Sequence, residues 1–110
     1  MTYDQQLAAR IREVLRSEHG VEEKPMFGGL AFMVDGHMAV AASGQGGMLV
    51  RVDPSEGAGL VEHTAATPMV MRGRPMAGWL TIDAAHVADA GELAEWVSRG
   101  VGCARSLPAK

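Results

Sequence analysis

Arginine side chains near one short segment have the chemistry best suited to binding. Arg72 and Arg74 lie in the segment Arg72–Trp79, which is dense in turn residues, and Arg51 lies at the end of a predicted strand. A guanidinium group binds carboxylates and phosphates through paired N–H donors. If Arg51, Arg72 and Arg74 converge beside Trp79, we expect them to bind a carboxylate, a phosphate or an acidic partner.

A structural role for the same arginines is the alternative. Acidic residues are close by in the sequence, namely Asp53, Glu56 and Glu62. Ion pairs between exposed side chains of opposite charge are common and contribute little to stability. The sequence favours this structural role over a binding site for the arginines.

No residue pattern in the chain predicts catalysis, a metal site or a cofactor. No serine lies in a G-x-S-x-G turn, and no carboxylate pair has surroundings that separate an acid from a base. The histidines are scattered, and none has ligand spacing from another or from the single cysteine. We expect surface roles for the histidines and a small, partly buried cysteine. The residues concerned are His19, His37, His63, His86 and Cys103.

Glycine and methionine patterns have structural interpretations that we favour over functional ones. Gly28 and Gly29 inside a strand indicate a bulge or the close approach of another backbone. A phosphate-binding loop would need a Lys-Ser/Thr pair and a following helix, which are missing. Eight methionines are many for this length, and Met69-x-Met71 could suggest soft-metal binding or an adaptable partner surface. We assign most of the methionines to the core.

Composition predicts one ordinary globular domain over residues 1–110. The chain is 47% hydrophobic and 21% charged, which excludes a disordered protein. Its net charge of −3 argues against direct binding to nucleic acid, which usually needs a basic surface. The single cysteine and the lack of a signal peptide or membrane-spanning segment predict a cytoplasmic protein.

Hydrophobic spacing predicts an α+β domain with the order α-β(3)-α-β(2)-α. A first helix starts with a capping box at Thr2 and ends near Gly20. Strands follow from about Lys24 to Val52, with a hairpin turn at Asp35-Gly36. A helix capped by Asp53, two further strands and a final helix capped by Asp89 complete the order. In the final helix Gly100 allows a close neighbour and Arg99 suits the end of the helix dipole. Its predicted buried stripe is Leu93, Trp96, Val97, Gly100, Val101 and Ala104. Helices on one face of a mainly antiparallel sheet form a two-layer α/β sandwich.

Four motifs in the same order resemble the N-terminal domain of the TfoX/Sxy family. They are Met26-Phe27-Gly28-Gly29-Leu30, Leu49-Val50-Arg51-Val52-Asp53-Pro54, Gly73-Arg74-Pro75-Met76-Ala77-Gly78-Trp79 and Ala104-Arg105-Ser106-Leu107-Pro108. Together they span nearly the whole chain. The resemblance implies the secretion-chaperone-like fold, which has the same element order as the one read from the residues.

The resemblance also implies a regulatory role. Family members with known roles are bacterial regulators of natural competence that act with the cyclic-AMP receptor protein and carry a second, C-terminal domain. This chain resembles the stand-alone members, for which the family implies no established activity and no catalytic residues.

We therefore expect a non-enzymatic regulatory or protein-interaction module whose partner belongs to the transcription machinery. The alternatives are a small-molecule or anion-binding domain that uses the Arg72–Trp79 loop and a weak DNA-associated cofactor. Sheet edges in so small a domain also suggest a homodimer.

Overall fold

The described part of the chain forms four α-helices and six strands. The structure is a computed structural model that describes residues 3–26, 28–44, 46–71 and 73–108. Its elements in chain order are α1 (Gln5–Val14) with a 3₁₀ turn at Leu15–Ser17, β1 (Val21–Met26), β2 (Gly29–Val34), β3 (His37–Ala42), β4 (Met48–Arg51), α2 (Pro54–His63), β5 (Thr67–Met71), β6 (Arg74–Ile82), α3 (Ala84–Val87) and α4 (Ala90–Ser106).

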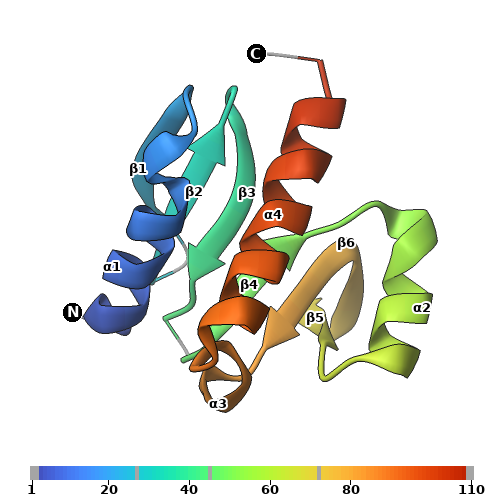
Figure 1. Cartoon of the computed structure of the whole chain (residues 1–110). Helices are drawn as coiled ribbons and strands as arrows, with labels where there is room; N and C mark the ends of the chain where they lie inside the picture. The colour runs from blue at the N-terminus through green and yellow to red at the C-terminus, as the bar shows by residue number, and fades with distance from the viewer. Residues whose placement is uncertain (1–2, 27, 45, 72, 109–110) are drawn as a thin grey trace.

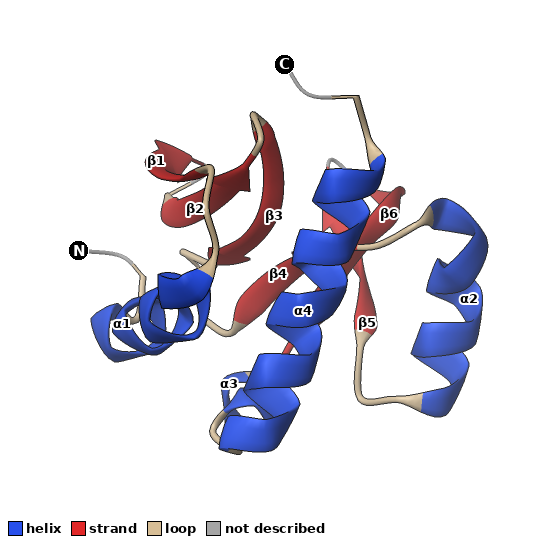
Figure 2. Ribbon diagram, turned by 45° about the horizontal axis from the view of Figure 1, so that its top comes forward, coloured by secondary structure: helices blue, strands red, loops and turns tan. Residues whose placement is uncertain are grey.

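All the described strands belong to one antiparallel sheet with the order β1-β2-β3-β4-β6-β5. Helices α1, α4 and α2 lie on one side of this sheet (Figure 1), and the strands twist strongly from β1 to β5 (Figure 2). The predicted α+β class and two-layer arrangement are confirmed. No helix in the described ranges has the length and apolar character needed to cross a membrane.

The sheet has one strand more before α2 than the predicted order contains. The predicted first strand is two strands, β1 and β2, which pair from Val21↔Val34 to Met26↔Gly29. Half of the residues of β1 are charged and all of them are exposed after Val21, so the strand lacks the alternation that marks a half-buried strand. Gly28 has a φ of 75° in the connection, and Gly29 contacts the Ala42 carbonyl so closely that a Cβ would not fit.

The segment predicted as a loop is mostly strand. Residues from Arg74 to Trp79 belong to β6, which forms a hairpin with β5 through a turn that contains Gly73. The prediction of a loop is wrong for Arg74–Trp79, because Pro75 and Gly78 lie within an irregular strand. The pairing shifts between Pro68 and Val70, and Gly78 has a φ of 83°.

Aspartate side chains cap the N-termini of three helices. Asp4 accepts hydrogen bonds from the N–H groups of Gln6 and Leu7, so α1 is capped there and not at Thr2, which lies outside the described residues. Asp53 and Asp89 cap α2 and α4, as predicted. The predicted Asp35-Gly36 turn is also confirmed, since both residues have positive φ.

Helix α4 is the main cover of the sheet. Its buried residues are the ones predicted from helical spacing: Leu93, Trp96, Val97, Gly100, Val101 and Ala104. At Gly100 the helix touches β3, because a Cβ there would lie 2.5 Å from the Ala39 carbonyl oxygen and 2.7 Å from a methyl carbon of Val40. Glycine at this position lets the helix sit close to the strand, as the sequence predicted.

A second, smaller apolar cluster fills the opposite face of the sheet. Its buried members come from strands alone and are Ala31, Met33, Met38, Ala41 and Leu49. Met69 and Trp79 pack against it. The core assignment of Met33 and Met38 is confirmed here, and that of Met48 in the cluster under the helices.

Proline lies in each of the two edge strands. Pro25 is in β1 and Pro68 in β5, and among the described strands each of these two pairs with one neighbour only. Because proline has no N–H to donate, it is tolerated in edge strands where that group would point to solvent. Each outer edge therefore lacks one donor for pairing with a further strand.

A matched pair of glycines in α4 tests the close contact with β3. We expect Gly100→Ala to lower the free energy of unfolding by about 1–3 kcal/mol, because a methyl group must displace β3. Gly102 has nothing within 4 Å of its Cβ position, so Gly102→Ala should raise stability by up to about 1 kcal/mol through helix propensity. Urea denaturation measures both, and the same sign for both variants would contradict this packing.

An ion pair between α1 and β1 predicts a pH-dependent contribution to stability. Arg12 donates two hydrogen bonds to Glu23, at 2.6 and 2.7 Å, and this bonding lowers the pKa of the Glu23 carboxyl. A lowered pKa means that the contribution is present above the usual glutamate range and is lost as the pH falls below it. We expect Glu23→Gln to cost about 0.5 kcal/mol at neutral pH, since the pair is largely exposed.

The cost of Glu23→Gln should vanish near pH 3, where the wild-type carboxyl is protonated as well. Denaturation at a series of pH values measures it. Glu22→Gln is the control, because Glu22 is a neighbour in β1 that has no ion pair within the described residues. A cost for Glu23→Gln that is constant with pH would contradict the assignment.

Candidate functional site

Among the described helices, α2 is the one that contains no fully buried residue, although Leu60 and Val61 pack against the main core. It lies against β6 and β5 and stands apart from α4 (Figures 1 and 2). The chain enters it from β4 through Val52, whose N–H donates to the Gly78 carbonyl at 2.8 Å. Because α2 stands apart, the domain has hollows on both sides of this helix.

The hollow on the β5–β6 side is an apolar groove of about 410 Å³. Four of its residues come from α2 at positions i, i+3, i+4 and i+7, which places them on one helix face. One comes from β5 and the others from β6. The lining residues are Pro54, Gly57, Ala58, Val61, Pro68, Pro75, Met76, Gly78, Trp79 and Leu80, and none of them is charged. We call this hollow the α2–hairpin groove.

Glycines set the shape of the α2–hairpin groove. A Cβ at Gly78 would lie 3.0 Å from the Val52 carbonyl oxygen and 3.3 Å from Pro54, so glycine allows β6 to approach the start of α2. Gly57 has nothing within 4 Å of its Cβ position and so keeps the groove open. Leu80 is buried at the base, whereas Met76 is 37% exposed. The result is an apolar surface that the described residues leave partly uncovered.

Arg51 and Trp79 are brought together, as the sequence-based hypothesis required. They are partners in the β4–β6 pairing, and the Arg51 guanidinium lies 5.0 Å from the centre of the Trp79 ring. A guanidinium over an indole ring is attracted by the ring's electrons. Trp79 also packs against the apolar cluster on the face of the sheet opposite the helices, and Arg51 is not among the described residues that line the α2–hairpin groove.

Arg74 lies on β6, the strand that contains Trp79, and apart from Arg51, which ends β4. It is five residues before Trp79 in β6, which corresponds to about 16 Å of extended chain. Its neighbour Pro75 lines the groove, and its own side chain is exposed. Arg51 and Arg74 therefore do not converge on a single small anion. Arg72, the third arginine of the hypothesis, lies outside the described residues.

Neither Arg51 nor Arg74 forms an ion pair within the described ranges. The sequence favoured ion pairs between these arginines and Asp53, Glu56 or Glu62. For Arg51 and Arg74 that prediction is wrong within the described residues. Asp53 instead accepts hydrogen bonds from the N–H and hydroxyl of Ser55, which lower the pKa of its carboxyl.

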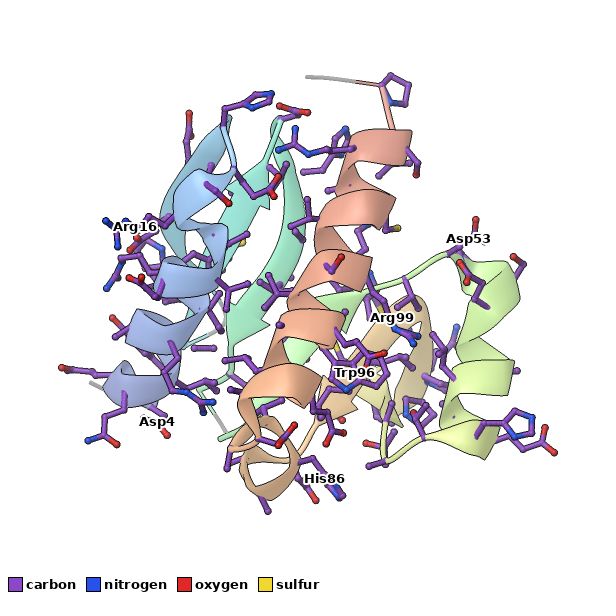
Figure 3. All side chains as sticks on the ribbon, viewed as in Figure 1. Asp4, Arg16, Asp53, His86, Trp96 and Arg99 are labelled. Atoms are coloured by element: carbon purple, nitrogen blue, oxygen red, sulfur yellow. The ribbon has the colours of Figure 1, made fainter. Side chains whose placement is uncertain are left out.

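The hollow on the other side of α2 is a polar cleft facing α4. One part of about 360 Å³ is lined by Val52, Asp53, Glu56, Leu60, Arg99, Gly102, Cys103 and Ser106. An adjoining part of about 440 Å³ shares Arg99 and reaches Trp96 and Glu95. Figure 3 shows Arg99 and Trp96 on the α4 side of this cleft and Asp53 at its upper end, and the Arg99 guanidinium lies 5.0 Å from the Trp96 ring centre.

The interpretation of the sequence did not predict this second cleft. Helical spacing assigned Trp96 to the buried stripe, which is correct, and Arg99 to the end of the helix dipole. A stripe of apolar residues shows which face of α4 is covered but not that α2 stands apart from it. The glycines of α2, Gly57 and Gly59, were the available signal, because they weaken a helix without any close contact that requires them.

Cys103 is partly buried, as predicted, and the structure gives its thiol no activating surroundings. Burial raises the pKa of Cys103, and the carboxylates of Asp53 and Glu56 raise it further against the opposite effect of Arg51. Nucleophilic and metal-binding cysteines need a lowered pKa, because the thiolate is the reactive form. The Cys103 thiol therefore packs as a small apolar group.

The histidines do not assemble with other ligand-type residues. His37 donates through Nε2 to the Pro108 carbonyl at 2.6 Å, and His86 lies 3.9 Å from a Glu92 carboxylate oxygen. Within the residues that the structure describes, no group of three histidine, cysteine, aspartate or glutamate side chains could hold a metal ion.

Comparison with known families identifies the chain. The model of the TfoX N-terminal domain matches residues 13–104, which is most of the sequence. The chain belongs to this family. Membership supports a regulatory or competence-related class of domain in general. No curated protein matches the chain.

The motifs that resemble the TfoX N-terminal domain now have positions in the structure. Two of them meet at the α2–hairpin groove: the β4 motif that ends at Asp53-Pro54, and the β6 motif from Gly73 to Trp79. The motif Ala104–Pro108 contains the C-terminal end of α4, where Arg105 donates hydrogen bonds to Asp35 at 3.3 Å and to Glu18 at 2.9 Å. This last contact joins the end of α4 to the loops before β1 and β3.

The raised pKa of Cys103 predicts slow alkylation. We expect iodoacetamide to modify folded Cys103 more slowly at pH 7.5 than it modifies the same chain in urea, and the rate to rise only at a pH above the usual thiol range. The measurement is the alkylation rate by mass spectrometry as a function of pH. Glu56→Gln should raise the rate modestly, because it removes one carboxylate that opposes the thiolate. Alkylation at neutral pH as fast as in the unfolded chain would show an exposed thiol.

Proposed function

We propose that this domain is a non-enzymatic regulatory module that binds a segment of a partner protein in the α2–hairpin groove. The observation that carries the proposal is the groove itself, an apolar hollow of about 410 Å³ in which none of the described lining residues is charged. Ligand-binding sites are typically concave and mostly apolar, with volumes of about 300–1,000 Å³. Membership of the TfoX N-terminal domain family supports a regulatory role.

Exposed apolar residues around the hairpin support a protein partner. Val70 in β5 is 62% exposed and Met76 in β6 is 37% exposed. Apolar patches rimmed by polar residues commonly mark protein-binding surfaces. Because the net charge of the chain is −3, electrostatics do not favour a nucleic acid as the partner. On this proposal the domain acts in the cytoplasm, and a component of the transcription machinery is the partner that its family favours.

Photo-crosslinking in cells tests the proposal. A benzophenone amino acid in place of Met76 should give a discrete crosslinked adduct with one protein, because Met76 lines the groove. The control is the same substitution at Met26, which is 36% exposed and lies on β1, at the other edge of the sheet. The adducts are detected on denaturing gels and their partners identified by mass spectrometry.

A second substitution tests whether the crosslinked partner binds in the α2–hairpin groove. Ala58→Glu places a carboxylate in the apolar groove on an exposed helical position, and we expect it to reduce the Met76 adduct at least fivefold. Ala9→Glu, on the exposed face of α1, should leave the adduct unchanged. No adduct at position 76, or equal adducts at 76 and 26, would rule out the groove as the binding surface.

A further inference from the structure

We propose that α2 has two positions, and that it swings toward α4 to close the polar cleft and widen the α2–hairpin groove. The position seen in the structure is the one with the cleft open. In the closed position Glu56 of α2 binds Arg99 of α4. The movement involves this chain alone, so it goes beyond the proposed function and its test needs no partner.

The two ends of α2 are anchored more firmly than the helix between them. Before the helix, the Val52 N–H donates to the Gly78 carbonyl at 2.8 Å, which fixes the chain at β6. After the helix, Ala66 is 2% exposed in the main core, and its N–H donates to the Thr64 hydroxyl at 3.1 Å. Between these points α2 buries no residue completely. A loop at each end joins α2 to β4 and to β5 (Figure 1), so the helix can swing about the line between its anchors.

Open space lies on both sides of α2. The α2–hairpin groove of about 410 Å³ is on one side, and the polar cleft of about 360 Å³ lies on the other side, toward α4. Three of the residues that line the cleft on α4 are small, namely Gly102, Cys103 and Ser106. Gly102 has nothing within 4 Å of its Cβ position. The distance between two helices depends on the side chains at their contact, so these positions do not obstruct the approach of α2.

The apolar contacts of α2 do not favour one position strongly. Among its described residues, Leu60 and Val61 are the two that pack against the main core. Leu60 lines the polar cleft, whereas Val61 lines the α2–hairpin groove. A swing toward α4 buries Leu60 further and uncovers Val61, so apolar surface lost from water on one side is regained on the other. We therefore expect the two positions to be close in free energy.

Opposite charges face each other across the polar cleft. Glu56 and Arg99 both line it and are exposed, and neither forms an ion pair within the described ranges. Arg99 is held over the Trp96 ring, on the α4 side of the cleft (Figure 3). Asp53 already accepts hydrogen bonds from Ser55 at the start of α2. Glu56 is therefore the carboxylate of α2 that closure brings to Arg99.

The other carboxylates of the cleft stay in place when α2 moves. Asp89, Glu92 and Glu95 line its adjoining part together with Arg99. They lie on α4 or at its start, so their distances from Arg99 do not depend on α2. Arg99 lines both parts of the cleft and so lies between these carboxylates and Glu56. Closure therefore adds one exposed ion pair, which is a small gain that suits a balance between two positions.

The two tryptophans report on opposite sides of α2. Trp79 lines the α2–hairpin groove, Trp96 lines the polar cleft, and the sequence has no other tryptophan. Incorporation of 5-fluorotryptophan therefore gives one fluorine NMR resonance for each side of the helix. Movement of α2 should change the surroundings of both rings together.

A disulfide to the native cysteine captures the closed position. Glu56→Cys places a thiol on the cleft face of α2, and a disulfide with Cys103 requires Cα atoms within about 7 Å of each other. We expect it to form in glutathione disulfide at least tenfold faster than in Ala58→Cys, the control on the groove face of the same helix. In the oxidised chain the Trp79 resonance should shift, although Trp79 lies on the other side of α2, because the groove beside it has widened.

The fluorine resonances also test the ion pair. The oxidised Glu56→Cys chain gives the Trp79 shift of the closed position, and the closed fraction of the reduced wild type is read against it. We expect Glu56→Gln to lower this fraction about threefold. Glu62→Gln is the control, since Glu62 is an exposed residue of α2 that lines neither hollow among the described residues. Thermal unfolding shows that each variant is folded.

Two results would overturn the movement: a disulfide that forms no faster in Glu56→Cys than in Ala58→Cys, or one that forms while the Trp79 resonance stays at its reduced position. Equal closed fractions in Glu56→Gln and Glu62→Gln would overturn the pair of Glu56 with Arg99. The Met76 adduct tests the proposed function independently of these measurements, so the movement and the proposed function can fail separately.

Discussion

The close contact of α4 with β3 is the constraint on which the other packing depends. Gly100 brings the helix backbone against Ala39 and Val40 in the middle of the sheet, and Leu93, Trp96, Val97 and Ala104 are buried on the same helix face. At its C-terminal end Arg105 joins the loops before β1 and β3. A helix held at this distance covers the centre of the sheet but cannot cover its β5–β6 end. That end is left to α2, which does so incompletely.

Incomplete cover by α2 explains why the hollows lie where they do. Asp53 and Pro54 start this helix at a fixed place, because Val52 is bonded to Gly78. The glycines that follow remove side chains from the helix surface without bringing another backbone close. Glycine within a helix costs up to about 1 kcal/mol relative to alanine. No close contact among the described residues requires glycine at Gly57 or Gly59. A partner segment bound in the α2–hairpin groove would occupy the open space beside Gly57.

Much of the fold could be predicted from the sequence, because its signals are local. Asp35-Gly36 gave the hairpin turn, Asp53 and Asp89 gave two helix starts, and the spacing from Leu93 to Ala104 gave the buried face of α4. Strand β1 was not separated from β2, since its charged residues show no alternation and it is ordered by pairing with β2 alone. The part of β6 up to Trp79 was predicted as a loop because it contains proline and glycine. Its extended conformation depends on pairing with β5 and β4, which the local sequence does not show.

The candidate site was harder to predict because it depends on contacts between distant segments. The contact of Arg51 with Trp79 follows from the pairing of β4 with β6, and nothing in the sequence near either residue specifies that register. The proposed grouping with Arg74 assumed a compact loop and therefore underestimated the separation along an extended strand. The apolar character of the groove came from residues of α2, β5 and β6 that no single motif contains.

Proline in both edge strands has a consequence for how this sheet meets other molecules. Many domains recognise a partner by adding its strand to an open sheet edge, so that the shared backbone ladder supplies affinity and sequence matters little at alternate positions. Pro25 and Pro68 interrupt that ladder at either end of the sheet. Selectivity in this domain must then come from side chains, so a few substitutions on one surface could redirect it to a different partner while the fold stays the same.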